Sequence, residues 1–142
     1  MAAVLGTGGL LAVSALTGCS EEPSTSAGPS STVPGVGQVT EASDGVQEVT
    51  IQTQDDYVFT PTAFTVDPGT VRLKVVNVAK QMTHNFRFTP GEGPEPIPAE
   101  ISLLAPGQEE TIEFEVREPG DHPFVCTFHT QLGQVGTMTV SG

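Results

Sequence analysis

The sequence predicts an all-β domain, on the basis of three observations. Apolar and polar residues alternate along several short segments, as they do in strands with one buried face. Proline, glycine and aspartate interrupt these segments, which is typical of turns between strands. No segment is long and periodic enough to predict a helix. The 142 residues, of which 37% are hydrophobic, suit one compact domain with appendages.

The first half of this domain is expected to form three strands. Val49 and Ile51 alternate with polar neighbours in the first, and Phe64 and Val66 do so in the second. A Pro-Gly turn then leads into a more continuous apolar strand over residues 71–78. The apolar faces of these strands are expected to meet in one core.

The next strand is predicted to direct a histidine inward. His84, Phe86 and Phe88 lie on one face of residues 84–88, because successive side chains of a strand point to opposite faces. His84 is therefore expected to be buried beside two aromatic rings. The prolines of residues 89–98 cannot donate a regular ladder of hydrogen bonds, so an extended loop follows.

The last part of the chain predicts three further strands. Apolar and polar residues alternate over residues 112–116. A turn at Gly120 then leads into a strand that places Phe124 and Cys126 on the same inward side. Residues 135–140 supply the final strand, with Met138 in the core.

The N-terminal residues favour export from the cytoplasm. Residues 4–16 are apolar or small and too few for a comfortable membrane span, as in the core of a signal peptide. The run ends in Leu16-Thr17-Gly18-Cys19, which looks like the bacterial lipoprotein processing box. No Lys or Arg precedes it, unlike an ordinary signal peptide. The alternative is an apolar tail with an incidental cysteine.

These features divide the chain into three parts. Residues 1–18 are expected to be a lipoprotein-type signal peptide. Residues 19–45, rich in Ser, Pro, Gly and Thr, would be a flexible tether, lipid-anchored through Cys19 to the outer face of a bacterial membrane. Residues 46–142 would form the domain, which we expect to be a monomer.

The charge of the chain limits its partners. The formal net charge is -12, so binding to nucleic acid or to anionic lipid headgroups is electrostatically disfavoured. Acidity on this scale either keeps the protein soluble or contributes to docking of a partner.

Cys126 and two histidines form the candidate metal site. If Cys19 carries lipid, Cys126 is the only thiol that remains, and metal ligation is a reason to keep a free thiol in an exported protein. One thiolate with the imidazoles of His84 and His129 is the donor set that selects copper in a trigonal electron-transfer site with a weak axial ligand. His122 completes no ligand pattern, and we expect it at the surface.

The chain resembles the cupredoxin family, in its plastocyanin-like branch, over residues 46–142. The resemblance rests on Gly69-Thr70-Val71, His84-Asn85-Phe86, Pro106-Gly107, Pro119-Gly120 and Cys126-x-x-His129-x-x-x-x-Gln134-Val135-Gly136. It implies a Greek-key β-sandwich of about seven to eight strands holding one type 1 blue copper ion near one pole. The implied function is one-electron transfer between Cu(I) and Cu(II) states, without enzymatic activity, between redox partners such as a cytochrome or a membrane oxidase or reductase.

The sequence departs from the plastocyanin-like pattern at the axial position. Gln134 stands where that branch has methionine, as in stellacyanin-like members. An amide oxygen is a harder donor than a thioether, so we expect it to favour Cu(II) and lower the reduction potential. Met138 lies about 13 Å further along a strand and cannot replace it. Met82 is expected to be a loop residue.

The resemblance also assigns roles around the metal. Asn85 would donate its backbone N–H to the thiolate and tie two loops through its side chain, or be an ordinary strand-edge residue. Electrons would enter and leave through His129, with Leu132 contributing to an apolar docking patch.

Several other functions are excluded or kept as alternatives. A multicopper oxidase or nitrite reductase needs additional histidine pairs, and the sequence has three histidines in all. A dinuclear copper A centre needs two cysteines in one loop. An extracytoplasmic copper carrier or chaperone that does not shuttle electrons is the main alternative, and a metal-free adhesion module is the other.

Overall fold

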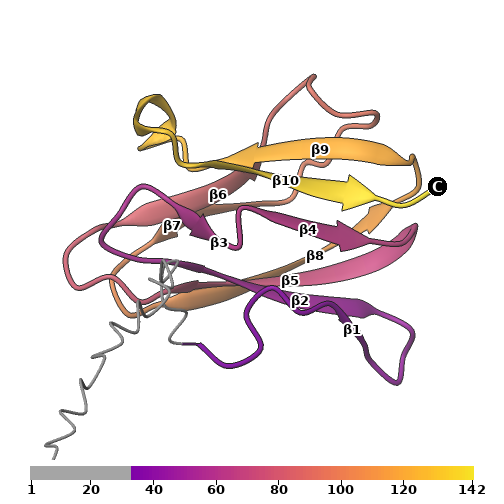
Figure 1. Ribbon diagram of the computed structural model, residues 1–142, viewed down its shortest axis with the longest axis horizontal. Coiled ribbons are helices and arrows are strands. Elements are labelled where there is room, and N and C mark those ends of the chain that lie inside the picture. The colour runs from indigo at the N-terminus through magenta and orange to yellow at the C-terminus, as the bar shows by residue number, and fades with distance from the viewer. Residues whose placement is uncertain (1–32) are drawn as a thin grey trace, which may run out of the picture.

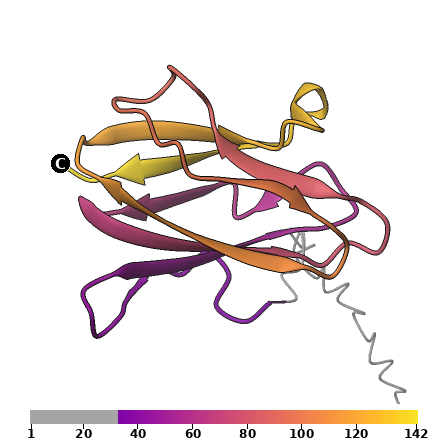
Figure 2. The same cartoon turned by 180° about the vertical axis from the view of Figure 1, so that it is seen from behind.

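The fold is a sandwich of two β-sheets, as the sequence predicts. The structure, a computed structural model, describes residues 33–142, and the two layers are visible from both sides in Figures 1 and 2. Its strands are β1 (Thr40–Glu41), β2 (Gln47–Thr53), β3 (Phe59–Thr60), β4 (Ala63–Val66), β5 (Gly69–Asn77), β6 (His84–Phe88), β7 (Glu100–Leu104), β8 (Glu109–Val116), β9 (Gly120–Val125) and β10 (Val135–Val140). One 3-10 turn, η1 (Thr130–Leu132), precedes β10.

Both sheets mix parallel and antiparallel pairs. The first has the order β1-β2-β5-β8, with β3 paired to β2, and β2 runs parallel to β5. The second has the order β4-β10-β9-β6-β7, and β4 runs parallel to β10. In this second sheet β6 lies beside β9 and runs antiparallel to it. The start of β6 and the end of β9, which are far apart in the sequence, therefore lie at the same end of the sheet.

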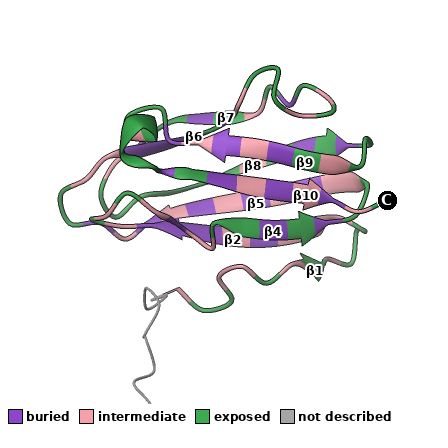
Figure 3. Cartoon of the chain, turned by 45° about the horizontal axis from the view of Figure 1, so that its top comes forward, coloured by how far each residue is buried: buried purple, intermediate pink, exposed green. Residues whose placement is uncertain are grey.

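The strands bury one face each, and the two buried faces form a single core. Burial alternates strictly along β5 and through β10, which appears as bands along these strands in Figure 3. At the centre the rings of Phe59, Phe86 and Phe124 contact one another edge-on or tilted, with centroids 5.0 to 6.0 Å apart. Such aromatic pairs add to the apolar area that they bury. Met138 is fully buried here, which confirms its prediction as a core residue.

Residues 33–45 correct the expected boundary of the domain. β1 pairs with β2, and the N–H of Gly37 donates to the carbonyl of Thr50. The part of the proposed tether that the structure describes therefore lies against the first sheet. Backbone pairing and the packing of Val39 against the core hold it there, although the segment shows no apolar alternation in the sequence. Residues 1–32, with the proposed signal peptide and Cys19, lie outside the described residues.

Two further differences concern strands and a histidine. The described part of the chain has ten strands rather than seven or eight, because β1 and β3 are only two residues long and β7 follows the proline-rich loop. His122, expected at the surface, is 2% exposed. The loop covers it, since a Cβ at Gly93 would lie 2.9 Å from its Nδ1. No helix within residues 33–142 is long and apolar enough to cross a membrane.

Candidate metal centre

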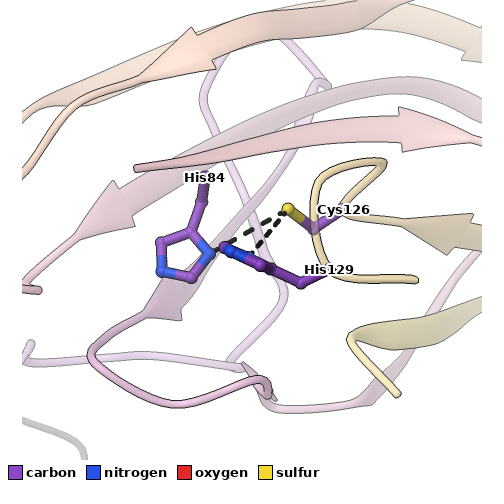
Figure 4. A group of neighbouring side chains, drawn as sticks. All are labelled: His84, Cys126 and His129. Atoms are coloured by element: carbon purple, nitrogen blue, oxygen red, sulfur yellow. Dashed lines mark hydrogen bonds between the residues drawn. The ribbon is translucent and has the colours of Figure 1, made fainter. Parts of the chain in front are cut away.

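The candidate metal centre lies at one end of the second sheet, where three segments meet. His84 is the first residue of β6, and Cys126 follows directly after β9. Thr130–Leu132 and the residues around it form the loop that brings His129 and Gln134 back toward Cys126 before β10 begins. Figure 4 shows the two imidazoles and the thiol pointing at a common centre.

The ligand loop is held by its own backbone hydrogen bonds. The N–H of Cys126 donates to the carbonyl of Gln134, and the N–H of Gln134 donates to the carbonyl of His129. The hydroxyl of Thr130 donates to the carbonyl of Cys126 at 2.8 Å. Gly133 ends the turn with φ of 90°, a conformation that favours glycine. The hydrogen bonds of the loop itself therefore set the spacing of Cys126, His129 and Gln134.

The donor atoms converge closely. Sγ of Cys126 lies 4.0 Å from Nδ1 of His84 and 3.6 Å from Nδ1 of His129. One ligand-type atom from each of the three residues lies within 4.8 Å of the others. Oε1 of Gln134 is 2.9 Å and 3.0 Å from the same two Nδ1 atoms. Four electron-pair donors thus surround one point.

The separations suit a trigonal metal. With metal–sulfur and metal–nitrogen bonds of about 2.3 and 2.0 Å, as at zinc, a planar 120° arrangement separates sulfur from nitrogen by about 3.7 Å. The observed separations of 3.6 and 4.0 Å bracket this value. The pocket therefore needs little rearrangement to hold an ion.

The hydrogen bonds of His84 leave an electron pair aimed at the centre. Its Nε2 lies 2.8 Å from the backbone carbonyl of Gln54, which can only accept, so Nε2 carries the proton. In the neutral ring Nδ1 then has a lone pair, and that lone pair faces the amide oxygen of Gln134. Two acceptors that face each other in a buried site are unfavourable unless a positively charged group satisfies both, and a bound metal ion would do so.

Burial keeps His84 in the form that binds metal. His84 is fully buried, and this desolvation lowers the pKa of its imidazole, because burial disfavours the charged form. The oxygens of Gln54 and Gln134 favour the charged imidazolium and so act in the opposite direction, but their effect is smaller. A neutral imidazole is the form that a metal requires.

The residues present therefore fit one copper ion. The set combines a soft thiolate, two imidazoles and a weak oxygen donor, which is the arrangement of a blue-copper electron-transfer site. Cys126 is buried and free, and no other group of metal-binding side chains occurs in residues 33–142.

Asn85 ties the two ligand-bearing segments together. Its Nδ2 donates to Oγ1 of Thr127 at 2.6 Å, and its Oδ1 accepts the N–H of Thr127 at 2.7 Å. This pair fixes the residue after Cys126 to the residue after His84. The expected side-chain tie is therefore present, while the bond from the Asn85 N–H to the thiolate stays a prediction.

An apolar rim surrounds the half-buried His129. The ring of Tyr57 contacts the imidazole edge-on at 5.2 Å between centroids, and Phe128 lies 6.4 Å away. Phe128 is 51% exposed and Leu132 57% exposed. We call Tyr57, Phe128 and Leu132 the rim residues. The sequence motifs point to Leu132 but not to Tyr57, which lies far from the ligand loop in sequence.

The residues that support His84 and Gln134 belong to no sequence motif. Gln54 acts through its backbone, which no side-chain motif can reveal. Thr53 accepts a hydrogen bond from Nε2 of Gln134 across 81 positions. Only the pairing of the sheets brings these residues together.

Comparisons with known proteins agree with this geometry. A family model described as a cupredoxin-like domain matches residues 14–140. A plastocyanin of Nostoc punctiforme is 35% identical over 92 residues, which are 59% of this chain and 65% of that protein. The match thus spans slightly less than two thirds of the plastocyanin.

Two solved structures illustrate the range of the fold. Reduced auracyanin from Roseiflexus castenholzii has a TM-score of 0.59 and 26% identity, covering 67% of this chain and 97% of that one. The metal-binding domain of a Cu(I)-exporting P-type ATPase from Streptococcus pneumoniae has a TM-score of 0.56 and 20% identity, covering 72% and 92%. Because the identity is only 20%, the likeness to the ATPase domain concerns the fold alone.

Proposed function

Because the chain belongs to the cupredoxin-like family, we propose that it is a blue copper protein that transfers single electrons through a mononuclear type 1 site. The observation that carries the proposal is the convergence of Cys126, His84 and His129 on one buried point. Bound copper supplies the one-electron chemistry, since Cu(II) accepts an electron from a reduced donor and Cu(I) passes it to an oxidised acceptor. No bond to a substrate is made or broken, so the proposed role is not enzymatic.

The surrounding hydrogen bonds support fast transfer. The backbone of Gln54 holds His84, and the loop's own bonds hold Cys126 and Gln134. These contacts do not involve a metal, so the ligands are positioned before copper binds. A site that rearranges little between oxidation states has a low barrier to electron transfer.

Addition of one equivalent of Cu(II) to the purified protein tests this proposal. We expect an intense thiolate-to-copper absorption band and narrow copper hyperfine splitting in the electron paramagnetic resonance spectrum. Cys126→Ser should lose the band, whereas Met138→Leu, at a buried position away from the centre, should keep it. A weak ligand-field spectrum in the wild type would contradict a type 1 site.

We further propose that Gln134 is the axial ligand and that it lowers the reduction potential. Support comes from its Oε1, which faces both imidazoles, and from the preference of a hard oxygen donor for Cu(II). Gln134→Met should raise the potential measured by redox titration. An unchanged potential in this variant would exclude axial control by Gln134.

The rim residues are proposed as the docking surface for electron entry and exit at His129. Exposed apolar side chains gathered around one functional residue are typical of interaction sites. Electron self-exchange between Cu(I) and Cu(II) copies, measured by NMR line broadening, provides a probe without an identified partner. Leu132→Glu should slow self-exchange, while Thr65→Glu, at an exposed position of β4, should change it much less. Equal slowing by both variants would argue against the rim.

We propose that the partners are a redox protein donor and acceptor, such as a cytochrome or a membrane oxidase or reductase, and that the protein acts as an exported, lipid-anchored monomer. The support for the anchor is the sequence Leu16-Thr17-Gly18-Cys19 after an apolar run. Cys19→Ala should abolish incorporation of radiolabelled palmitate and release the protein from membranes. Retention of the label would show that lipid is attached elsewhere.

The copper-carrier alternative predicts a different behaviour of the bound ion. A carrier releases Cu(I) to an acceptor, whereas an electron-transfer protein keeps copper through many redox cycles. Mixing the loaded protein with a Cu(I) chelator of graded affinity measures the exchange rate directly. Retention of copper over repeated oxidation and reduction is the result expected here.

A further inference from the structure

The amide of Gln134 has two ends, and only one of them can serve the proposed copper site. Its oxygen can donate an electron pair to a metal, whereas its NH₂ group can only donate hydrogen bonds. The side chain is fully buried, so the end that does not face the centre must find a partner inside the protein. A partner that accepts a hydrogen bond from the NH₂ group stabilises the orientation in which the oxygen points inward.

Thr53 provides that partner. Its Oγ1 lies 3.0 Å from Nε2 of Gln134 and accepts a hydrogen bond from it. Thr53 is 1% exposed and is the last residue of β2, in the sheet opposite the one that carries the ligands. The oxygen of the amide then faces Nδ1 of His84 and Nδ1 of His129.

We propose that Thr53 is a positioning residue that holds the oxygen of Gln134 toward the copper and thereby helps to set the reduction potential. The inference rests on the proposed type 1 site. Without the hydroxyl, the inward orientation would leave the NH₂ group buried and without an acceptor, which is unfavourable. The amide would then no longer be held with its oxygen inward, and the donor that favours Cu(II) over Cu(I) would be weakened.

Thr53→Val tests this role, because valine keeps the shape of threonine but lacks the hydroxyl. We expect the affinity for Cu(II) to fall about tenfold relative to that for Cu(I), which for a one-electron couple raises the potential by about 59 mV. The copper hyperfine splitting should change as well. Thr53→Ser should restore the wild-type values, and Thr50→Val, a matched change elsewhere on β2, should leave them unaltered.

A double-mutant cycle separates positioning from a general structural effect. In the Gln134→Met background no amide remains to be oriented, so Thr53→Val should leave the potential unchanged. The same shift in both backgrounds, or no shift in either, would overturn the inference. If Thr53→Val does not fold, NMR of the wild-type Cu(I) protein decides: the NH₂ protons of Gln134 should contact Thr53 and not the imidazoles.

The outcomes also distinguish the inference from the proposed function. A wild-type protein without the thiolate band would overturn both. A wild-type protein with the band, combined with a Thr53→Val variant of unchanged potential and spectrum, would overturn the role of Thr53 alone.

Discussion

His84 uses its two ring nitrogens in opposite ways, and the difference organises the site. Nε2 donates to the carbonyl of Gln54, so the ring cannot rotate without losing that bond. Nδ1 is left as the metal-facing electron pair. A backbone carbonyl thus fixes both the orientation and the tautomer of a candidate ligand, as a supporting group commonly does at metal-binding histidines.

Asn85 acts on the same scale by joining the residues that follow two ligands. Asn85→Ala removes two hydrogen bonds to Thr127 from a buried position, so the free energy of unfolding should fall by about 1–3 kcal/mol. Urea denaturation of the copper-free protein measures this change. Thr127→Ala removes the bond to the hydroxyl and keeps the bond from the backbone N–H, so it separates the two. A loss below about 0.5 kcal/mol would mean that the tie contributes little.

At the scale of elements, β10 carries the ligand loop into the core through a close approach at Gly136. A Cβ there would lie 2.4 Å from two ring carbons of Phe124 and 2.7 Å from the carbonyl of Thr62. Glycine is therefore required for packing between Gln134 and Met138. The ring of Phe124 can lie against this part of β10 only because the position has no side chain.

Gly136→Ala should consequently destabilise the protein by about 1–3 kcal/mol, since overpacking displaces the ring or the strand. The displacement should also perturb the copper spectrum, because Gln134 is two residues away. Adding Phe124→Leu should recover part of the Gly136→Ala penalty, as measured in a double-mutant cycle. Purely additive effects of the two substitutions on stability would show that the Phe124 ring does not cause the destabilisation.

The loop before β6 is held by a carboxylate from another segment. Asp55 accepts the backbone N–H groups of Lys80, Gln81 and Met82 at 2.7 to 3.0 Å. The hydrogen bond from Lys80, followed by that from Gln81, lowers the pKa of Asp55 from its ordinary value of 3.8. The neighbouring Gln54 holds His84, so residues 54 and 55 together fix the entry to β6 and its first side chain.

Stability should therefore depend on acid through Asp55. A carboxyl whose pKa is lowered on folding stabilises the protein above its ordinary pKa, and this contribution disappears as the pH falls through the lowered value. Asp55→Asn should be less stable than the wild type at pH 7, and the difference should shrink below pH 3.8. Thermal unfolding across this range measures it, with Glu110→Gln as a surface control. A constant difference between wild type and Asp55→Asn would contradict the prediction.

At the scale of the whole molecule, charge governs encounters with redox partners. The formal net charge of -12 creates a negative field that attracts cations and repels anions over roughly the Debye length, about 10 Å at 0.1 M salt. The rim residues are apolar, so the long-range field and the contact surface have different chemistry. The field should influence association rates more than the contact itself.

Small inorganic oxidants can measure this field. Oxidation of the Cu(I) protein by a tricationic cobalt complex should slow by about tenfold as ionic strength rises from 10 mM to 0.5 M, since salt screens the attraction. Oxidation by ferricyanide, an anion, should accelerate over the same range. Rates that do not respond to salt for either oxidant would show that the charge does not act at the site of transfer.

The sequence predicted the parts of this protein that depend on local order. Two-residue alternation correctly placed His84, Phe86 and Phe88 on a buried face, and put Cys126 inward after Phe124. The spacing in the ligand loop was readable because its hydrogen bonds join residues at most eight positions apart. The family followed from the same motifs.

The sequence could not reveal contacts that depend on which strands pair. β1 has no apolar pattern, and it joins the sheet by pairing with β2. His122, a polar residue near the start of a strand, was expected at the surface, yet the proline-rich loop covers it. In each case a distant segment supplies the environment.

The sequence by itself therefore determined the all-β class, the four candidate ligands and the fit to copper, because period and spacing are properties of short segments. Only the tertiary structure decided how those ligands are oriented. Thr53 and Gln54, at the end of β2 and in the loop after it, bond to Gln134 and His84, while Asp55 bonds to the loop before β6. Orientation depends on partners across the core, which the order of residues does not state.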